Sequence, residues 1–321
     1  MPPSFCRHNR FVQNCPICSP AATKAPPAAR RPAGSAPTRS TRSAARPGRS
    51  SAVRVRQLHQ AADDGYRCEL VTGIKATVDA ERLAGELAFA TARLAELAAD
   101  PPGLYADILL LADEDVEEAL WLAFLAAYVC PRSDDDEDPF ANVRDAHVPW
   151  ASGELPRLDV PRGLRGALDP AGGERTILAY RAWVTRAGSQ QAAFAGEPAW
   201  TPERRFDRIF ERLALPGLMR DPRYELLVSL GRLGVVELRP SSLQFGDGDT
   251  TTAAKRVFGI GDKILLERRA RALAEAVDVP IEALDLALFN WGARGGARAT
   301  YGSRAVVADE QRGAIAGVLG V

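Results

Sequence analysis

The sequence has no apolar run long enough to cross a membrane. Its most apolar stretch, residues 119–130, follows a markedly acidic segment and falls far short of the roughly 20 residues that a membrane-spanning helix needs. The start of the chain also has no apolar core of the kind found in secretion signals. These absences argue against a membrane or exported protein, and they favour the reducing cytoplasm.

Acidic residues are absent from the first 62 positions. This stretch has eleven Lys and Arg residues and no Asp or Glu, which leaves 30 basic and 41 acidic residues for positions 63–321. The net charge of zero therefore hides a basic N-terminal arm and an acidic body. Such an arm is attracted to polyanions, so we expect it to contact DNA or RNA. An arm that is merely soluble is the alternative.

Cysteine is scarce, with five residues in the whole chain and none after Cys130. Three of the five lie near the N-terminus with a histidine, in the spacing Cys-x-His-x6-Cys-x2-Cys. The four potential ligands are Cys6, His8, Cys15 and Cys18. Four such side chains form the closed tetrahedral coordination of a structural zinc ion. Binding of Zn²⁺ would also supply the folding energy of a segment with little apolar core.

Residues 1–19 are therefore predicted to form a zinc knuckle. A redox-active CxxC pair and disulfide bonds are the alternatives, and the histidine at ligand spacing argues against both. Basic and aromatic residues among the ligands suit contact with nucleic acid. A knuckle of this kind also suits docking of a protein partner, and the sequence does not separate the two roles.

Residues 20–52 consist mainly of Pro, Ala, Ser and Arg. They contain too few large apolar side chains to bury a core, so we predict a disordered basic linker. A folded domain is predicted over residues 53–321. At its start, the segments 53–58 and 66–73 flank an Asp-Asp-Gly sequence and are predicted to pair as a short β-hairpin.

Helical patterns dominate the rest of this domain, so the predicted fold class is mainly α. One apolar face of a helix of about twenty residues is formed by Leu83, Leu87, Ala90, Leu94 and Leu97. Periodicity and capping signals predict further helices at about 114–130, 175–188, from 201, from 221 to 231–234, at 250–257 and at 263–277. The last helix is expected to direct Ile264, Leu265 and Leu273 toward the core.

The most informative segment is the turn between the last two predicted helices, at residues 258–263. Its Gly-Ile-Gly sequence places consecutive backbone N–H groups at the N-terminus of a helix, where they can bind a phosphate. Lys263 begins the second helix, and Asp285 lies 22 residues further on. We expect this arrangement to bring an amine and a carboxylate beside a bound nucleic-acid backbone.

In this segment the sequence resembles the helix-hairpin-helix superfamily of DNA glycosylases. There the turn is Gly-apolar-Gly, a lysine follows two residues later in the members with lyase activity, and an aspartate follows a further helix. Lys263 and Asp285 occupy these positions, with a gap a few residues longer than in the shorter members. The resemblance covers residues 250–295, and no cysteines for an iron–sulfur cluster follow the turn.

The resemblance implies a helical domain that binds double-stranded DNA and turns the target base out of the stack. Asp285 would stabilise the positive charge that develops on the sugar as the glycosidic bond breaks. Lys263 would attack the sugar to form a Schiff base. The implied DNA contacts come from the turn and the helix after it: Gly259, Ile260, Gly261, Arg268 and Arg269.

Simpler roles remain open for the same residues. Lys263 and Glu267 are spaced for an ion pair on one helix face, and Asp285 could cap a helix or pair with an arginine. Four aromatic residues are candidates either for stacking on an extruded base or for the core: Trp183, Trp200, Phe206 and Trp291.

The sequence therefore predicts a DNA glycosylase-like enzyme that excises a damaged or modified base, in repair or in defence against modified phage DNA. It is expected to be cytoplasmic and associated with the nucleoid. One alternative is a base-modifying enzyme of the thymine-hypermodification type on the same fold. The other is a non-catalytic adaptor that binds DNA through its knuckle, arm and hairpin.

Overall fold

The computed structural model describes residues 61–133 and 137–321, which belong to one compact unit spanning residues 57–321. The predicted zinc knuckle, with its four ligands, and the predicted basic linker lie outside the described residues. In the described part of the chain, no group of His, Cys, Asp and Glu side chains is arranged to hold a metal ion.

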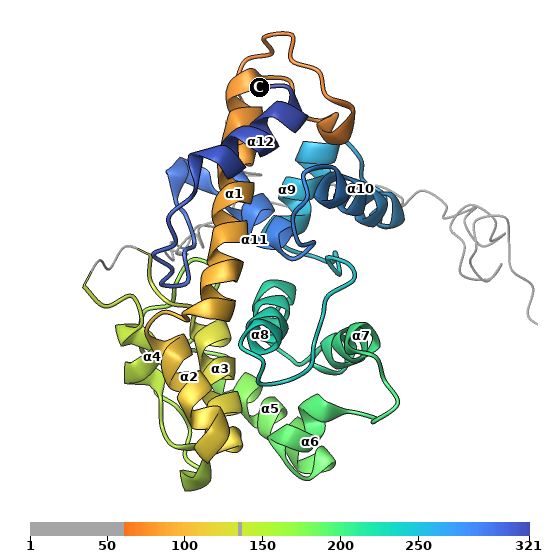
Figure 1. Ribbon diagram of the computed structural model, residues 1–321. Coiled ribbons are helices and arrows are strands. Elements are labelled where there is room, and N and C mark those ends of the chain that lie inside the picture. The colour runs from red at the N-terminus through yellow and green to blue at the C-terminus, as the bar shows by residue number, and fades with distance from the viewer. Residues whose placement is uncertain (1–60, 134–136) are drawn as a thin grey trace, which may run out of the picture. The chain divides into compact units, whose positions relative to one another are not determined.

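Helices follow one another along the described part of the chain, which contains no β-strand, and this confirms the mainly α class (Figure 1). The helices are α1 (Thr77–Ala99), α2 (Leu104–Glu114), α3 (Val116–Val129), α4 (Ala141–Ala146), α5 (Gly173–Ala187), α6 (Gln190–Ala195), α7 (Pro202–Arg212), α8 (Arg220–Arg232), α9 (Asp249–Phe258), α10 (Lys263–Ala276), α11 (Ala283–Gly292) and α12 (Asp309–Leu319). Single 3-10 turns lie at η3 (Glu69–Val71), η4 (Trp150–Ser152) and η5 (Arg294–Gly296).

The helices form two groups that α1 and α8 connect. Figure 1 shows α9, α10, α11 and α12 gathered along the first part of α1, with α2 to α7 at its far end and α8 between the two groups. Helix α1 packs mainly against α11 and α12, whereas α8 packs against both α3 and α1. Residues far apart in the sequence therefore meet around α8.

Helix α1 confirms the apolar face that the leucine spacing predicts. Leu83, Leu87 and Leu94 are at most 3% exposed, and α1 packs mainly against α11 and α12. The indole N–H of Trp291 donates to the backbone oxygen of Asp79 at 2.9 Å and fixes α11 against α1. Although α1 has 23 residues, no helix in the described residues is long and apolar enough to span a membrane.

Helix α3 is buried on all sides, as its composition predicts. The carboxylate of Asp115 accepts a hydrogen bond from the backbone N–H of Glu118 at 3.1 Å and closes the first turn. The ring of Phe124 stacks on that of Tyr180 with centroids 3.9 Å apart, a contact worth about 1 kcal/mol beyond burial. Helix α3 therefore anchors α5, which contains Tyr180.

The starts of α7 and α8 differ in how they are closed. Thr201 caps α7 as predicted, because its hydroxyl accepts from the N–H of Arg204 at 3.3 Å and Pro202 is the first helical residue. Helix α8 begins one residue earlier than predicted, at Arg220, and ends within the predicted range. Asp221 does not cap it, since its carboxylate bonds to the Arg220 guanidinium.

The predicted β-hairpin is wrong in its second segment, where residues 69–71 form η3 in place of a strand. Its first segment lies outside the described residues. The Asp64 carboxylate accepts from the N–H of Tyr66 at 3.0 Å and forms a local turn. The Tyr66 hydroxyl then donates to the backbone oxygen of Leu319 at 2.5 Å. Contacts to α12 thus hold this segment, and no strand pairs with it within residues 61–133 and 137–321.

Candidate active site

The predicted turn between two helices is present at residues 258–263. Helix α9 ends at Phe258, and Gly259 follows in the left-handed conformation with φ of 64°, which glycine adopts without strain. The carboxylate of Asp262 accepts from the N–H of Leu265 at 2.9 Å and caps α10. The two helices and the turn between them that the sequence predicts are therefore confirmed.

A neighbouring segment supports this turn from behind. The N–H of Gly73 donates to the backbone oxygen of Val257 at 2.9 Å, and the Thr72 hydroxyl donates to that of Phe258 at 2.7 Å. Gly73 has no room for a side chain, because a Cβ there would lie 1.9 Å from the backbone oxygen of Arg256. The turn is thus held in one position relative to η3.

Two apolar side chains beside the turn are exposed, contrary to the predicted inward orientation. Ile264 is 79% exposed and Leu265 is 45% exposed. The buried face of α10 is instead formed by Leu266, Ala270 and Leu273, so the helix is rotated relative to the prediction and only Leu273 was placed correctly. The exposed pair lies next to Lys263, and together they form the accessible edge of the hairpin.

Lys263 is exposed and forms no ion pair with any described residue. Its possible partner Glu267 instead accepts from the backbone N–H groups of Leu243 and Phe245, both at 2.8 Å. This lysine therefore lies in solvent and lacks the desolvated surroundings that activate an amine as a nucleophile. An exposed ammonium suits contact with phosphate.

The two predicted arginines of α10 differ in their surroundings. Arg269 donates to the backbone oxygen of Glu69 at 3.0 Å, whereas Arg268 is exposed. Arg268 is therefore the more accessible of the two for contact with DNA.

Asp285 lies in the first turn of α11 and is 2% exposed. Its Oδ2 accepts from Nη2 of Arg165 at 2.6 Å, and its Oδ1 accepts from Nη1 of Arg220. Two guanidinium groups from distant parts of the chain therefore hold one buried carboxylate. Pairing with arginine was one of the simple roles left open by the sequence.

These side chains belong to a larger group of buried charges, which we call the ionic network. Asp221 Oδ1 lies 3.0 Å from Arg220 Nη1 and 3.7 Å from Arg165 Nη2. Glu225 Oε2 lies 3.9 Å from Arg165 Nη1, and its Oε1 lies 2.5 Å from Nη2 of Arg93. The network thus contains three arginines and three carboxylates, so its formal charges balance: Arg93, Arg165, Arg220, Asp221, Glu225 and Asp285.

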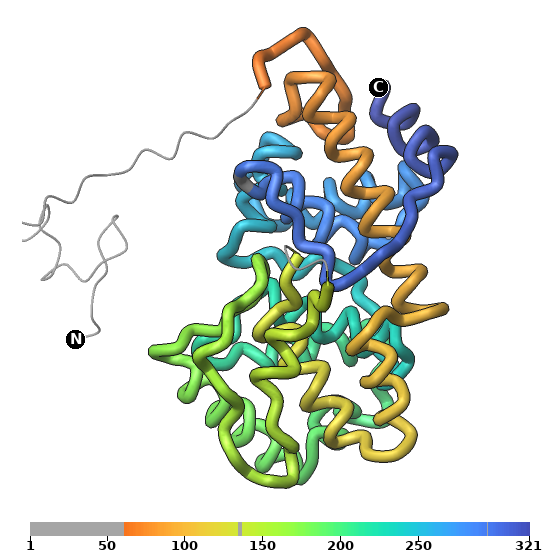
Figure 2. Tube along the Cα trace, turned by 90° about the vertical axis from the view of Figure 1, so that its left-hand side faces the viewer, coloured from red at the N-terminus to blue at the C-terminus, as the bar shows by residue number. Residues whose placement is uncertain are grey.

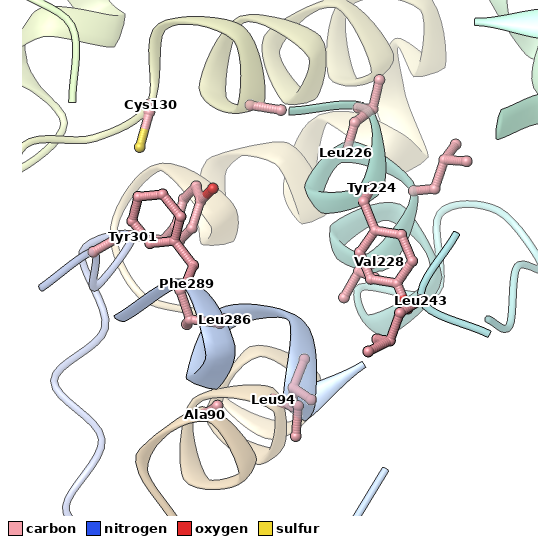
Figure 3. Close-up of a cluster of buried hydrophobic side chains, with 14 of the residues drawn as sticks. Ala90, Leu94, Cys130, Tyr224, Leu226, Val228, Leu243, Leu286, Phe289 and Tyr301 are labelled. Carbon is pink, nitrogen blue, oxygen red and sulfur yellow. The ribbon is translucent and has the colours of Figure 1, made fainter. Parts of the chain in front are cut away.

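Aromatic rings enclose the network on one side. The Arg165 guanidinium lies 4.9 Å from the ring centroid of Phe289 and 5.8 Å from that of Tyr301. Figure 3 shows these two rings close together, with the Cys130 thiol beside them. Burial raises the pKa of this thiol to about 11, so Cys130 contributes packing and no charge at neutral pH.

The network shifts the pKa values of several of its members. Burial alone would lower the pKa values of Arg165 and Arg220, but the neighbouring carboxylates, Asp285 and Asp221 foremost, act together against burial and hold both pKa values above their ordinary value. Burial alone would raise the pKa of Asp221, whereas Arg165 and Arg220 shift it below its ordinary value. Arg165, Arg220 and Asp221 are therefore charged at neutral pH.

The lowered pKa of Asp221 makes stability depend on pH. Above about pH 4, the pKa of a free aspartate, Asp221 is ionised in both states and its full contribution is present. As the pH falls below about 4, the unfolded chain binds the proton first, so this contribution is lost toward the lower pKa of the folded state. The free energy of unfolding, measured with urea between about pH 3 and pH 7, should fall more steeply toward low pH for the wild type than for Asp221→Asn. Parallel curves would contradict the assignment.

Asp285 and the hairpin turn lie at opposite ends of α9. Nη2 of Arg165, which bonds to Asp285, also lies 3.5 Å from the hydroxyl of Thr250 in the first turn of α9. Gly259 follows the last residue of this helix, about 13 Å away along its axis at 1.5 Å per residue. A DNA strand advances about 3.4 Å per nucleotide. The distance between the turn and the buried network therefore corresponds to roughly four nucleotides of a DNA strand.

The aromatic candidates for base stacking belong to the core. Trp183 and Trp200 are each 6% exposed, and Phe206 and Trp291 are fully buried. None of the four side chains presents an open face for a base. The structure therefore places all four in the core, which is the alternative role that the sequence left open for them.

A cavity of about 700 Å³ lies beside the segment that leads to Arg165. Its lining residues are Arg132, Ser133, Pro161, Arg162, Gly163, Leu164, Ala297 and Arg298. Figure 2 shows the chain after α11 running from the upper helices to the lower ones, and there the N–H of Thr300 donates to the Ser133 hydroxyl at 3.0 Å. This crossing closes one side of the cavity.

Sequence reasoning identified Asp285 and missed its partners. Asp221 and Glu225 are like charges at an i, i+4 spacing in α8, and such a repulsive pair is a signal for buried arginine partners. Arg165 gave no signal, because it lies in an irregular segment without periodicity. Only the fold shows that this segment meets α8 and α11.

The part of the chain that contains most of the network is similar to a known family. Residues 167–297 match the family model of the alpha-glutamyl/putrescinyl thymine pyrophosphorylases, clade 3. The matched part runs from α5 to α11 and includes Arg220 and Asp285, whereas Arg165 lies just before it. No curated protein and no solved structure matches the chain.

Proposed function

We propose that this protein is an enzyme that changes the substituent of a thymine-derived base in DNA and leaves the glycosidic bond intact. The observation that supports this most is the similarity of residues 167–297 to the alpha-glutamyl/putrescinyl thymine pyrophosphorylases. The matched part contains both the hairpin and Asp285, the two features that the sequence singled out. This similarity favours the base-modifying alternative over the glycosylase predicted from the sequence.

The family name refers both to a thymine that bears an amine and to pyrophosphate. A single substitution reaction at the exocyclic carbon of the base accounts for both groups. The nitrogen of a small amine forms a bond to the exocyclic carbon of the base, while the bond from that carbon to a pyrophosphate oxygen breaks. Pyrophosphate leaves with the bonding electron pair, and the new C–N group gives up one proton. The protein then has to accept that proton and stabilise the departing charge.

In this proposal Asp285 accepts the proton from the amine. Each arginine that binds Asp285 has a second carboxylate within reach, so both keep an ionic partner when Asp285 is protonated, although the network then carries one excess positive charge. Arg220 lies 3.0 Å and Arg165 lies 3.7 Å from Asp221. When Asp285 turns toward a substrate, neither guanidinium is left as an unpaired buried charge.

The hairpin edge binds the DNA strand in this proposal. The exposed Lys263 contacts a phosphate, while Ile264 and Leu265 pack against the sugar edge. Replacing Lys263 by glutamine should weaken DNA binding several-fold for all sequences and reduce the slope of log affinity against log salt by about 1. Titration of labelled DNA at several salt concentrations measures both. The exposed Arg208 on α7 offers a control, and an Arg208→Gln variant should keep the wild-type slope.

The proposed reaction has a direct test. Duplex DNA that contains a thymine-derived base with a pyrophosphate ester on its exocyclic carbon is incubated with the full-length protein and either putrescine or glutamate. We expect pyrophosphate to appear in solution and a digest of the DNA to yield a nucleoside heavier than thymidine by the attached amine. If the protein binds the DNA but the nucleosides stay unchanged with either amine, the proposal is wrong. The non-catalytic DNA-binding adaptor would then be the better interpretation.

A further inference from the structure

We infer that the arginine-lined cavity beside Arg165 is a binding site for phosphate groups, separate from the hairpin turn. Two of its lining arginines, Arg162 and Arg298, come from segments 136 positions apart in the sequence. None of the described residues that line it is acidic. By contrast, the cavity beside α4 is lined by carboxylates as well as arginines, Glu96 and Asp138 among them.

Arg298 is held in place by groups outside the cavity. Its Nε donates to Oε2 of Glu86 at 2.9 Å, and its guanidinium carbon lies 3.8 Å from the ring centroid of Phe89. These contacts use the Nε edge and one face of the guanidinium. The terminal Nη groups remain available for a ligand, and the side chain is 38% exposed. A fixed guanidinium loses less conformational entropy when an anion binds.

Arg162 approaches from the opposite wall. It is exposed, and its Nη1 donates to the backbone oxygen of Gly166 at 3.2 Å, which leaves Nε and Nη2 for a ligand. The wall beside it is rigid: a Cβ on Gly163 would lie 2.2 Å from the backbone oxygen of Pro131. This glycine therefore lets the wall of the cavity lie directly against the chain after α3.

The shape and charge of the cavity favour phosphate over other anions. The planar fork of a guanidinium binds two oxygens of one phosphate at once, and a cavity of about 700 Å³ has room for more than one phosphate group. The same chemistry has two possible sources, the backbone of a DNA strand or a pyrophosphate group. Both place negative charge beside the segment that positions Arg165.

The test measures binding without any base substrate, so its result does not depend on the proposed reaction. Calorimetric titration with inorganic pyrophosphate is done on the full-length wild type, Arg162→Gln and Arg298→Gln, with Arg208→Gln on α7 as the control. In a second arm the same four proteins bind duplex DNA over a range of salt concentrations. Arg162 is exposed, so its replacement should leave the fold intact, which circular dichroism checks.

A loss of pyrophosphate affinity of about tenfold or more in both cavity variants supports the site and identifies a pyrophosphate group as its ligand. A salt slope for DNA that falls by about 1 in each cavity variant supports it with the DNA backbone as the ligand. If both variants match the wild type and the control in both arms, the inference is wrong. Turnover measured on Asp285 variants tests the proposed reaction separately. Its outcome does not change the binding results for the two cavity variants.

Discussion

An Asp285→Asn variant is expected to lose turnover on modified DNA by a factor of about 10² to 10⁴, the range for removal of a general base, while its DNA affinity is retained. The amide cannot accept the proton, whereas the hairpin that we propose to contact DNA lies at the other end of α9. The variant also leaves the buried network with one excess positive charge. Its free energy of unfolding should therefore fall by about 3 kcal/mol.

Three measurements on the same preparation check this expectation: initial rates of pyrophosphate release, DNA affinity and urea unfolding. The matched control is Asp249→Asn, since Asp249 is exposed in the first turn of α9 and belongs to no ion pair among the described residues. It should behave as the wild type in all three. An Asp285→Asn protein that is folded and fully active would remove Asp285 from the chemistry and leave it a purely structural role.

A Gly73→Ala variant is expected to lower both stability and DNA affinity. The added Cβ would lie 1.9 Å from the backbone oxygen of Arg256 and 2.6 Å from the backbone nitrogen of Gly259. Because both neighbours are backbone atoms, the segment before α1 and the hairpin turn must separate. Overpacking of this kind costs about 1–3 kcal/mol, and the displaced turn should present its N–H groups to phosphate less well.

Gly85 in α1 provides the matched control, because a Cβ there would meet nothing within 4 Å. Gly85→Ala should leave DNA affinity unchanged and raise the free energy of unfolding by up to about 1 kcal/mol, since alanine is the better helix former. Thermal unfolding and DNA titration of the two variants compare them directly. Equal stabilities for the two alanine variants would show that the contact between Gly73 and the turn does not constrain the fold.

The sequence predicted the elements whose signals are local. The leucine spacing of α1, the acidic start of α3, and the Thr-Pro start of α7 each lie within one or two helical turns, and each is confirmed. The hairpin turn was equally accessible, because its two glycines and the capping aspartate are adjacent in the sequence. In these segments the local preference and the tertiary structure agree.

Short elements and those determined by distant contacts were not predicted. Helices α4 and α6 have six residues each, too few for a periodic pattern to appear. Residues 66–73 have an alternating composition that suits a strand, but the described residues offer no strand to pair with, and bonds to α12 and to the hairpin fix the segment instead.

The residues of the candidate site also divide into those with a local sequence signal and those brought together only by the fold. Asp285 could be found from its spacing to the hairpin, but its partners Arg165 and Arg220 are 120 and 65 residues away in sequence. No single-sequence pattern relates positions so far apart. The cavity arginines are likewise brought together only by the chain crossing after α11. The chemistry of the site was thus partly accessible from the sequence, whereas its geometry was not.

The most direct way to distinguish base modification from base excision is to count abasic sites and substituted nucleosides on the same DNA. After reaction of a duplex with a single pyrophosphate-bearing thymine derivative, abasic sites are counted by cleavage in alkali, and substituted nucleosides are counted by mass spectrometry of a digest. We expect amine-substituted nucleoside in proportion to released pyrophosphate, with no abasic sites above those of untreated DNA. Abasic sites that accumulate with free base in solution would contradict this expectation, and would identify a glycosylase.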